Sequence, residues 1–534
     1  MTYTIKEDCI SCDICQSKCP HGAIKAATEG EGYWVDPTLC DGCPDVEVPR
    51  CVGACDMDAL MPLPTKKGRC KSSLLPVAIP KIFLNRKTTP FASCMVVWET
   101  CNILAQRQSL PWQVDANGEI YYRRPVNRNR GEMRFRLIAD PETEVSVPMA
   151  AGDAMAAIAD FDIRATCVHL IFAAHAMTLD CPWQEFFVLN DQHIEKYLGL
   201  DKRKDLTKLE KLTLIKNLVY QSCQILVALD WPRQGRVDAF TLDEHPVWDL
   251  LGTEYYFEED QQGCRRLIGL GFTVQAGQWS KHFLNKQEYR SQTAFYQYGT
   301  LPKSLLREVM SNWQQHEGAI RILLWSLFKL RLGSEQRMKV RTLLRIAYGE
   351  DRLHKATTVR GAHKRLLKTF ESDLETLYYY GLKPAFDPET YPSDIQPLWA
   401  KSAEIPDDID EAVDFWADEA SRSLTDNAPR DKWQRLLNAR LLGFELSEEW
   451  QESVRRKVPK RRRRKQSKTW KVNQKEKLSG SDINIARLQK KLSQRALAER
   501  LGKSQSWIRD VEKDRFQVNV DDQALLRQVL NIPQ

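Results

Sequence analysis

Hydrophobic positions recur at helical spacing in four segments of the central region. The helices predicted in this way are Lys208–Ser222, Ser304–Gln315, Ala319–Leu332 and His363–Tyr380, and Gly381 closes the last of them. Two shorter apolar runs, Ile225–Leu229 and Val237–Leu242, flank a turn at residues 233–235 and are predicted as strands. The pattern therefore indicates a core that is mixed at first and mostly helical later.

The helix at 208–222 followed by this hairpin resembles a winged-helix unit. Further along, residues 383–406 contain five prolines and show little periodicity. This composition predicts a linker or a connection along the surface.

Near the C-terminus, apolar residues fall in short blocks separated by helix-capping residues. Ser493 is expected to cap one helix and Ser504 a second, with Gly502 supplying the positive φ of the turn between them. Predicted inward positions are Ala496, Leu497, Leu501, Trp507, Ile508 and Val511. The block therefore predicts two short helices joined by a tight turn.

A chain of 534 residues is too long to fold around one hydrophobic core, so several domains are expected. Hydrophobic residues make up 43% and charged residues 28%, as in ordinary soluble proteins. No apolar stretch reaches the roughly 18 residues of a membrane span, and the first residues form no secretory leader. These observations predict a soluble, cytoplasmic protein with reduced cysteines.

Eight of the fifteen cysteines lie in two closely spaced blocks near the N-terminus. The first, C-x2-C-x2-C-x3-C-P, contains Cys9, Cys12, Cys15, Cys19 and Pro20. The second, C-x2-C-x7-C-x3-C, contains Cys40, Cys43, Cys51 and Cys55. Two residues between cysteines let a tight loop aim soft thiolates at one iron–sulfur face, so the blocks predict ligands for two clusters.

The first block is similar to the bacterial two-cluster ferredoxins, in which the fourth cysteine of each block binds the other cluster. This resemblance assigns Cys9, Cys12, Cys15 and Cys55 to one cluster, and Cys40, Cys43, Cys51 and Cys19 to the second. Both clusters are expected to be [4Fe–4S]. In the second block, Asp56 replaces the usual proline and residues 44–50 lengthen the loop, which predicts a modified site.

Zinc and disulfides are the alternative interpretations of these blocks. Structural zinc prefers C-x2-C pairs separated by a dozen or more residues. Disulfides are disfavoured in a reduced compartment. The other cysteines are interpreted as small buried residues, with redox sensing as the alternative: Cys70, Cys94, Cys101, Cys167, Cys181, Cys223 and Cys264.

Between Arg455 and Lys471 there are eleven lysines and arginines in seventeen residues, and no acid. Such a run predicts an arm that binds nucleic acid by releasing counterions from phosphates. A solvated linker and a nuclear-localisation signal are the alternatives.

The capped block after this run resembles the Cro/repressor-type helix-turn-helix, through Gln494, Ala498, Gly502, Ser504, Ile508 and Glu512. In that fold the second helix enters the major groove. The resemblance predicts base contacts from Gln505, Ser506 and Arg509, and phosphate contacts from Gln494, Lys503 and Lys513, with Ser504 at the same surface. A generic three-helix packing unit is the alternative, and Trp507 is expected in its core.

The central region shows no catalytic motif, so no catalytic residue is predicted and the chain is not expected to be an enzyme. His169, His175 and Trp98 are interpreted as core residues. The predicted fold is multidomain α+β. Its parts are a ferredoxin-like domain (1–65), a mixed α/β domain (80–300), a mainly helical region (301–450), a basic linker (451–480) and an all-α helix-turn-helix (481–534).

A two-cluster ferredoxin domain and a Cro-type domain at opposite ends of one chain resemble the PatB/CnfR family of cyanobacterial activators of nitrogen-fixation genes. The resemblance implies a transcriptional activator that works at low oxygen, binds promoter DNA, and has RNA polymerase and a redox donor as further partners. The competing hypothesis is an iron–sulfur redox enzyme targeted to nucleic acid. A plain electron carrier is disfavoured because the cluster blocks occupy only a small part of the chain.

Overall fold

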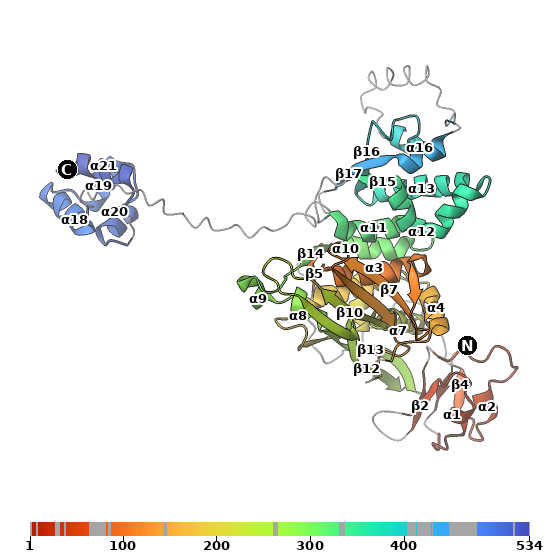
Figure 1. Cartoon of the computed structure of the whole chain (residues 1–534). Helices are drawn as coiled ribbons and strands as arrows, with labels where there is room; N and C mark the ends of the chain where they lie inside the picture. The colour runs from red at the N-terminus through yellow and green to blue at the C-terminus, as the bar shows by residue number, and fades with distance from the viewer. Residues whose placement is uncertain are drawn as a thin grey trace. The chain divides into compact units, whose positions relative to one another are not determined.

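In the computed structural model, the chain divides into two compact units, residues 1–456 and 457–534 (Figure 1). The structure describes residues 3–6, 9–26, 32–36, 39–62, 82–83, 87–143, 147–259, 265–330, 337–402, 413, 429, 431–447, 478–515 and 518–532. The basic run at 455–471, Cys70 and Cys264 lie outside the described residues. No described helix is long and apolar enough to cross a membrane.

The N-terminal part of the first unit is built from short strands that pair in two antiparallel ribbons. The pairs are β1 (Tyr3–Ile5) with β4 (Leu60–Pro62), and β2 (Ile24–Ala26) with β3 (Tyr33–Val35). Two short helices, α1 (Ile14–Lys18) and α2 (Arg50–Gly53), each carry one buried cysteine, Cys15 and Cys51. These cysteines share a small core with Ile5, Ile24 and Leu60.

A five-stranded antiparallel sheet lies in the main body, with the order β11-β10-β8-β7-β6. Its strands are β6 (Trp112–Val114), β7 (Ile120–Val126), β8 (Gly131–Leu137), β10 (Ile225–Trp231) and β11 (Phe240–Pro246). Separately, β5 (Thr88–Ala92) pairs with β14 (Tyr298–Pro302). Helices near these strands are α3 (Met95–Gln106), α4 (Ala151–Asp160), α8 (Trp279–Phe283) and α9 (Lys286–Ser291).

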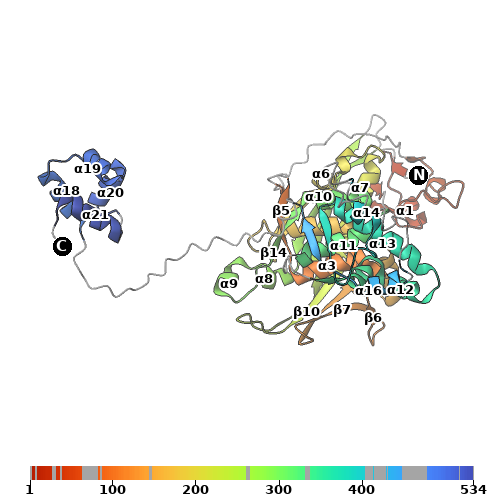
Figure 2. The same cartoon turned by 90° about the horizontal axis from the view of Figure 1, so that it is seen from above.

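Two groups of elements each combine three helices with a three-stranded antiparallel sheet. The first comprises α5 (Ala165–Ala176), β9 (Phe186–Asn190), α6 (Asp191–Leu198), α7 (Lys208–Cys223), β12 (Trp248–Glu259) and β13 (Arg265–Ala276). The second comprises α11 (Glu317–Lys329), β15 (Met338–Lys339), α12 (Val340–Thr358), α13 (Ala362–Tyr379), β16 (Leu382–Phe386) and β17 (Arg440–Leu446). Figure 2 shows α11, α12 and α13 side by side, as their contacts require.

The remaining elements connect or cover these groups. They are the single 3₁₀ turns Arg107–Ser109 and Leu200–Lys202, and the helices α10 (Lys303–Asn312), α14 (Leu398–Ser402) and α16 (Lys432–Asn438). Inside α12, Gly349 has φ 82° and breaks the helical conformation. A Cβ at this glycine would lie 2.7 Å from the Ser109 hydroxyl oxygen, so the kink occurs where the chain passes close to the 3₁₀ turn.

One continuous hydrophobic core extends from Ile82 to Phe444. His169 and His175 are completely buried within it, as expected from the sequence, and Trp98 is nearly so. Burial lowers the pKa of His169 to about 4. The ring is therefore neutral near pH 7, which agrees with its two contacts, the Trp248 indole N–H at 2.8 Å and the Val97 carbonyl at 2.9 Å.

The predicted helices are confirmed within a few residues, as α7, α10, α11 and α13. The hairpin prediction needs two corrections. The second strand begins at Phe240 rather than Val237. The hairpin β10–β11 also joins the five-stranded sheet, whereas the strands that follow α7 in the three-helix group are β12 and β13, which the sequence pattern did not indicate.

The proline-rich segment is not a linker in its described part. Residues 382–386 form β16, and Tyr391 and Ile395 are fully buried. The Trp399 indole donates to the Glu371 carbonyl on α13 at 3.0 Å. In this described part the segment packs against the helices, because rings with a fixed φ suit an irregular buried path as well as a flexible one.

Gly318 offers a test of how tightly α11 packs against α12 and α13. A Cβ there would lie 2.2 Å from Asp373 Oδ2 and 2.7 Å from the Tyr348 ring, and these two buried side chains are hydrogen-bonded to each other. Although alanine is the better helix former, we expect Gly318→Ala to destabilise the first unit by about 1–3 kcal/mol.

Calorimetric unfolding measures this effect. Gly152→Ala in α4 is the matched control, because nothing lies within 4 Å of its added Cβ. We expect the control to raise the unfolding temperature slightly and Gly318→Ala to lower it. Equal shifts in the unfolding temperature of the two variants would contradict the close packing of α11 against α12 and α13.

Candidate metal centre and nucleic-acid interface

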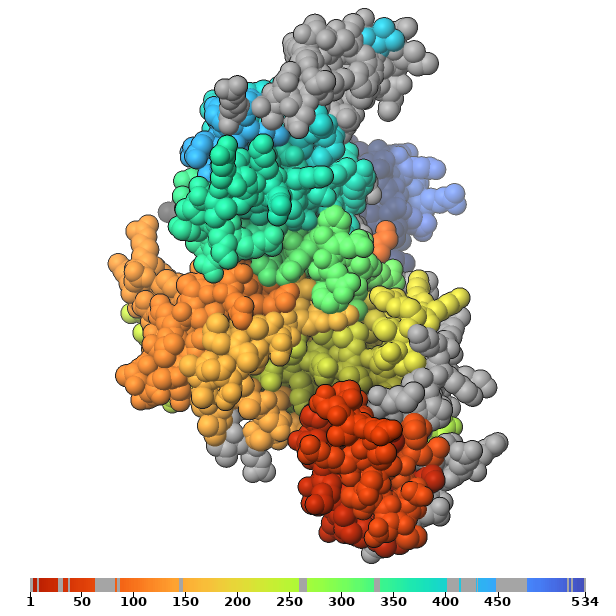
Figure 3. All heavy atoms as spheres, turned by 90° about the vertical axis from the view of Figure 1, so that its right-hand side faces the viewer, coloured from red at the N-terminus to blue at the C-terminus, as the bar shows by residue number. Residues whose placement is uncertain are grey.

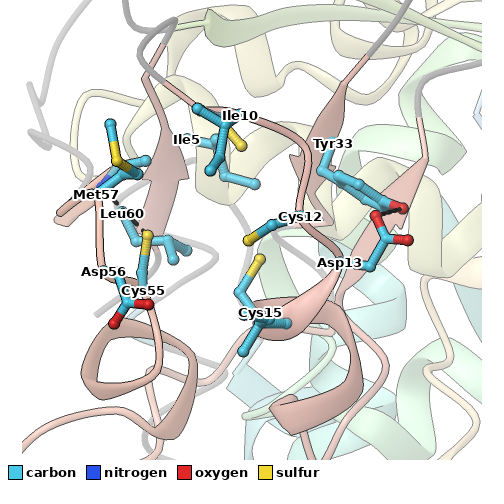
Figure 4. A pocket seen from close by; sticks show the side chains of 13 residues that line it. Ile5, Ile10, Cys12, Asp13, Cys15, Tyr33, Cys55, Asp56, Met57 and Leu60 are labelled. Atoms are coloured by element: carbon cyan, nitrogen blue, oxygen red, sulfur yellow. Dashed lines mark hydrogen bonds between the residues drawn. The ribbon is translucent and has the colours of Figure 1, made fainter.

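Four thiols from both cysteine blocks face one cavity of about 100 Å³. They belong to Cys9, Cys12, Cys15 and Cys55, and the rest of the lining is largely apolar. Figure 4 shows Cys12, Cys15 and Cys55 around this space, with Ile5, Ile10, Met57 and Leu60 beside them. Three thiols from one block and one from the other is the arrangement that the ferredoxin resemblance implies.

Electrostatic coupling divides the cysteines into the same two sets. Burial, together with Cys9, Cys55 and Cys12, raises the pKa of Cys15. Burial and the thiols of Cys19, Cys40 and Cys43 raise the pKa of Cys51 to about 11. Thiolates packed together in this way repel each other unless cations neutralise them, as the irons of a cluster do. The assignment of individual cysteines as ligands remains a prediction.

The fourth cysteine of each block sits in the same local turn. The Ala23 amide donates to Cys19 Sγ at 3.3 Å, and the Ala59 amide donates to Cys55 Sγ at 3.4 Å. Amide hydrogen bonds of this kind favour the thiolate and tune the potential of a bound cluster. The turn that contains Asp56 therefore keeps the amide–sulfur hydrogen bond of the turn that contains Pro20.

The loop of the second block is held by a carboxylate. Asp41 Oδ1 accepts from the Cys43 amide at 2.8 Å, and Asp41 Oδ2 lies 3.2 Å from His21 Nε2. Among the described residues, no three His, Cys, Asp or Glu side chains converge closely enough for a single metal ion. Thiolates of a cubane each bind a different iron, so they need not converge that closely.

A buried ion pair joins the N-terminal part to α7. Lys216 Nζ lies 2.7 Å from Asp36 Oδ2, and the two side chains are 5% and 0% exposed. The Asp36 carbonyl also accepts from the Cys40 amide at 3.0 Å. Beside this pair, the Trp34 ring lies 4.6 Å from Tyr255 on β12. The second cysteine block is therefore connected to the main body through few residues, and sequence patterns did not indicate this contact.

The described residues of the C-terminal unit form four helices: α18 (Gly480–Gln489), α19 (Gln494–Leu501), α20 (Gln505–Glu512) and α21 (Val520–Leu530). The predicted caps are present, since Ser493 accepts from the Ala496 amide and Ser504 from the Trp507 amide. Gly502 ends α19 with φ 63°. A core of Ile483, Leu497, Leu501, Ile508, Val511, Leu526 and Leu530 holds the helices together.

The predicted base-contacting residues lie on an open surface. Gln505, Ser506 and Arg509 are exposed on α20, and Lys513 is exposed just after it. Ser504 is exposed at the N-cap and lies 2.9 Å from the Ser506 hydroxyl. Because these side chains share the first turns of one helix, they are available together to the edges of bases.

Two predicted phosphate contacts are engaged inside the unit. The Gln494 amide donates to Glu512 Oε2 at 2.8 Å, and Lys503 Nζ lies 2.9 Å from Asp522 Oδ1. Trp507 is only partly buried against the core, with Lys503 over its ring. The nearly buried pair of Arg487 and Glu512 joins α18 to α20, and sequence patterns did not indicate it.

Comparisons with known proteins match the two ends of the chain. The 4Fe-4S binding domain family matches residues 2–25, and the helix-turn-helix family matches residues 483–533. The "Ferredoxin-like protein in nif region" of Trichormus variabilis is 49% identical over 57 residues, 10% of this chain and 48% of that protein. The "Ferredoxin-like protein in vnf region" of Azotobacter chroococcum is 37% identical over 51 residues, 10% of this chain and 75% of that protein.

The chain thus spans about half the length of the first of these relatives. The crystal structure of domains 2 and 3 of RctB covers 53% of this chain and 85% of its own, with 12% identity and a TM-score of 0.26, too low to define the fold. The family matches establish iron–sulfur clusters as the cofactors of the N-terminal domain. Through that domain the chain belongs to the 4Fe–4S ferredoxin-like family, and it carries a helix-turn-helix DNA-binding domain at its other end.

Proposed function

We propose that this protein is an iron–sulfur-dependent transcriptional regulator of the PatB/CnfR type, which activates nitrogen-fixation genes at low oxygen. The observation that carries the proposal is the presence of a cluster domain and a DNA-binding domain on one chain. The names of the relatives, which place them in nif and vnf regions, support the choice of target genes. RNA polymerase and a redox donor as partners, and a cytoplasmic location, are parts of this proposal.

The cluster is the sensor in this proposal. Cys12 is exposed, and Ile10, Ile14 and Met57 around the cavity are also largely exposed. A cluster held there is open to oxygen and to redox partners. Its loss removes the cross-link between the two cysteine blocks, since a small cysteine-rich domain derives much of its folding energy from the metal it binds.

The route from cluster to DNA begins at the contact with α7. The Cys40 amide donates to the backbone carbonyl of Asp36, and the carboxylate of the same residue pairs with Lys216. Unfolding of the second cysteine block displaces Asp36 and removes its carboxylate from Lys216. Coupling of this kind requires an element with two arrangements, and we propose this contact as that element.

Removal of one cluster ligand tests the sensor. We expect Cys12→Ser to lower the iron content by about half or more, because four thiolates hold each cubane. It should also abolish promoter activation in cells grown without oxygen. Cys181→Ser, outside both blocks and also partly exposed, is the control and should change neither. Full activation by a variant that lacks the cluster would refute the sensor role.

Replacement of Gln505 and Arg509 by alanine tests the recognition helix. Each side chain is expected to contribute about 1–3 kcal/mol to discrimination between bases. The double variant should therefore bind its selected promoter weakly but retain affinity for unrelated duplexes. Competition binding measures both, with Arg495→Ala on the exposed face of α19 as control. An unchanged preference would show that α20 does not contact bases.

The buried ion pair provides a test of coupling. Lys216→Met leaves the buried Asp36 carboxylate with Lys25 as its remaining cation, and loss of one partner of a buried pair costs up to about 3–5 kcal/mol. Asp36→Asn with Lys216→Met removes both charges and should restore stability. In this double variant we expect DNA affinity to respond less to air than in the wild type.

Titration of promoter DNA before and after exposure to air measures this response, and iron analysis confirms that the clusters load equally. A double variant that responds to air as strongly as the wild type would exclude Asp36 and Lys216 from the signalling route.

A further inference from the structure

The two three-helix groups of the first unit have the same topology. In each group a strand follows the first helix and two strands of the same sheet follow the third, and the last strand pairs with both others. In the first group β10 and β11 lie between α7 and β12, and in the second residues 387–439 separate β16 from β17. The sheet orders are β12-β13-β9 and β15-β17-β16, all antiparallel. Three helices and a hairpin in this order form a winged helix, in which the third helix is the one that enters a DNA groove. The third helices here are α7 and α13.

The first of these helices is covered. On α7, Leu212, Ile215, Leu218 and Val219 are fully buried, and Lys211 and Lys216 are nearly so. Lys216 is paired with Asp36 of the ferredoxin domain, and Lys208 is paired with Asp191 and Glu195. Lys208 and Lys216 are therefore neutralised within the protein and Lys211 is buried, so α7 offers no open basic face.

The third helix of the second group, α13, has an exposed basic face instead. Lys364, Arg365 and Lys368 are exposed along its first two turns. From Arg352 to Lys368 the chain has six lysines and arginines in seventeen residues and no acid: Arg352, Lys355, Arg360, Lys364, Arg365 and Lys368. None of the six forms an ion pair with a described residue. Figure 3 shows α12 and α13, in teal, on the face turned to the viewer.

The turn before α13 is as tight as that of a helix-turn-helix. Only residues 359–361 separate α12 from α13, and Gly361 adopts φ 83°. The Ala362 amide donates to the Val359 carbonyl across this turn at 3.2 Å. The N-terminus of an 18-residue helix carries a partial positive charge, which adds to the attraction of phosphate.

A buried polar network fixes the orientation of α13. Asp373 accepts from the Tyr348 hydroxyl and lies 3.4 Å from His316 Nδ1, so one side chain contacts both other helices of the group. Leu366, Phe370, Leu374 and Leu377 bury the apolar face of α13. The exposed cations therefore stand on a rigid support, as a DNA-contacting helix requires.

We propose that residues 317–446 form a second DNA-binding module, in which α13 enters the major groove and Lys364, Arg365 and Lys368 contact phosphates and base edges. The ligand is duplex DNA, because a helix with this exposed basic face fits a groove about 12 Å wide, and because the same chain carries a helix-turn-helix. The inference rests on the DNA binding proposed above. Two modules on one chain raise the affinity for a site that accommodates both.

Footprinting with the full, cluster-loaded chain tests the module. The probe is duplex DNA selected from a random library by the wild-type protein and cleaved by hydroxyl radicals. We expect two separate protected segments. Lys364→Ala/Arg365→Ala/Lys368→Ala should lose one segment, and Gln505→Ala/Arg509→Ala should weaken the other. The α13 triple variant should also bind at least about tenfold more weakly, with a salt dependence reduced by a slope of about 2–3.

The matched control replaces three exposed cations elsewhere on the unit, Lys202, Lys204 and Arg290, and should leave the footprint unchanged. Lys364→Gln/Arg365→Gln/Lys368→Gln repeats the test should the alanine variant unfold. An α13 variant with the wild-type footprint and salt slope would overturn the second module. Wild-type protein that binds no duplex at all would instead overturn the proposed function.

Discussion

The buried carboxylate of Asp36 is the constraint on which the arrangement of the first unit depends. A carboxylate removed from water must be neutralised, since the cost of leaving it unpaired is several kcal/mol. Asp36 finds its cations in Lys25 of its own domain and in Lys216 on α7. The ferredoxin domain is thus attached to the main body by a buried ion pair. Trp34 against Tyr255 and Phe257 adds apolar contact at the same place.

The two winged-helix groups differ in what covers their third helix. Their sheets follow the same order, but only one of the two third helices is open. Lys208 and Lys216 on α7 pair with carboxylates inside the protein. The lysines and arginine at the start of α13 face solvent. The two groups therefore share a strand order but differ in surface charge, which suits them to different roles. One group receives the ferredoxin domain, and the other is available for nucleic acid.

Short-range patterns were informative where local chemistry decides the structure. The cysteine spacings led to the cluster domain, and Ser493, Gly502 and Ser504 occupy the cap and turn positions expected of them. Amphipathic helices such as α13 were also predictable, because a helix that packs on one face has apolar residues spaced three or four positions apart. The pairing of β13 with β9 was not, since alternating and continuous apolar runs do not reveal which distant strand will pair.

By itself, the sequence determined the ligand chemistry, the capped helices and the concentration of charge, because each depends on residues close together in the chain. Tertiary structure alone decided which thiols share a cavity and that Asp36 meets Lys216. It also decided which of two equivalent helices keeps an open basic face. These outcomes depend on contacts between residues far apart in sequence, and burial changes the cost of a charge or thiol only after such contacts form.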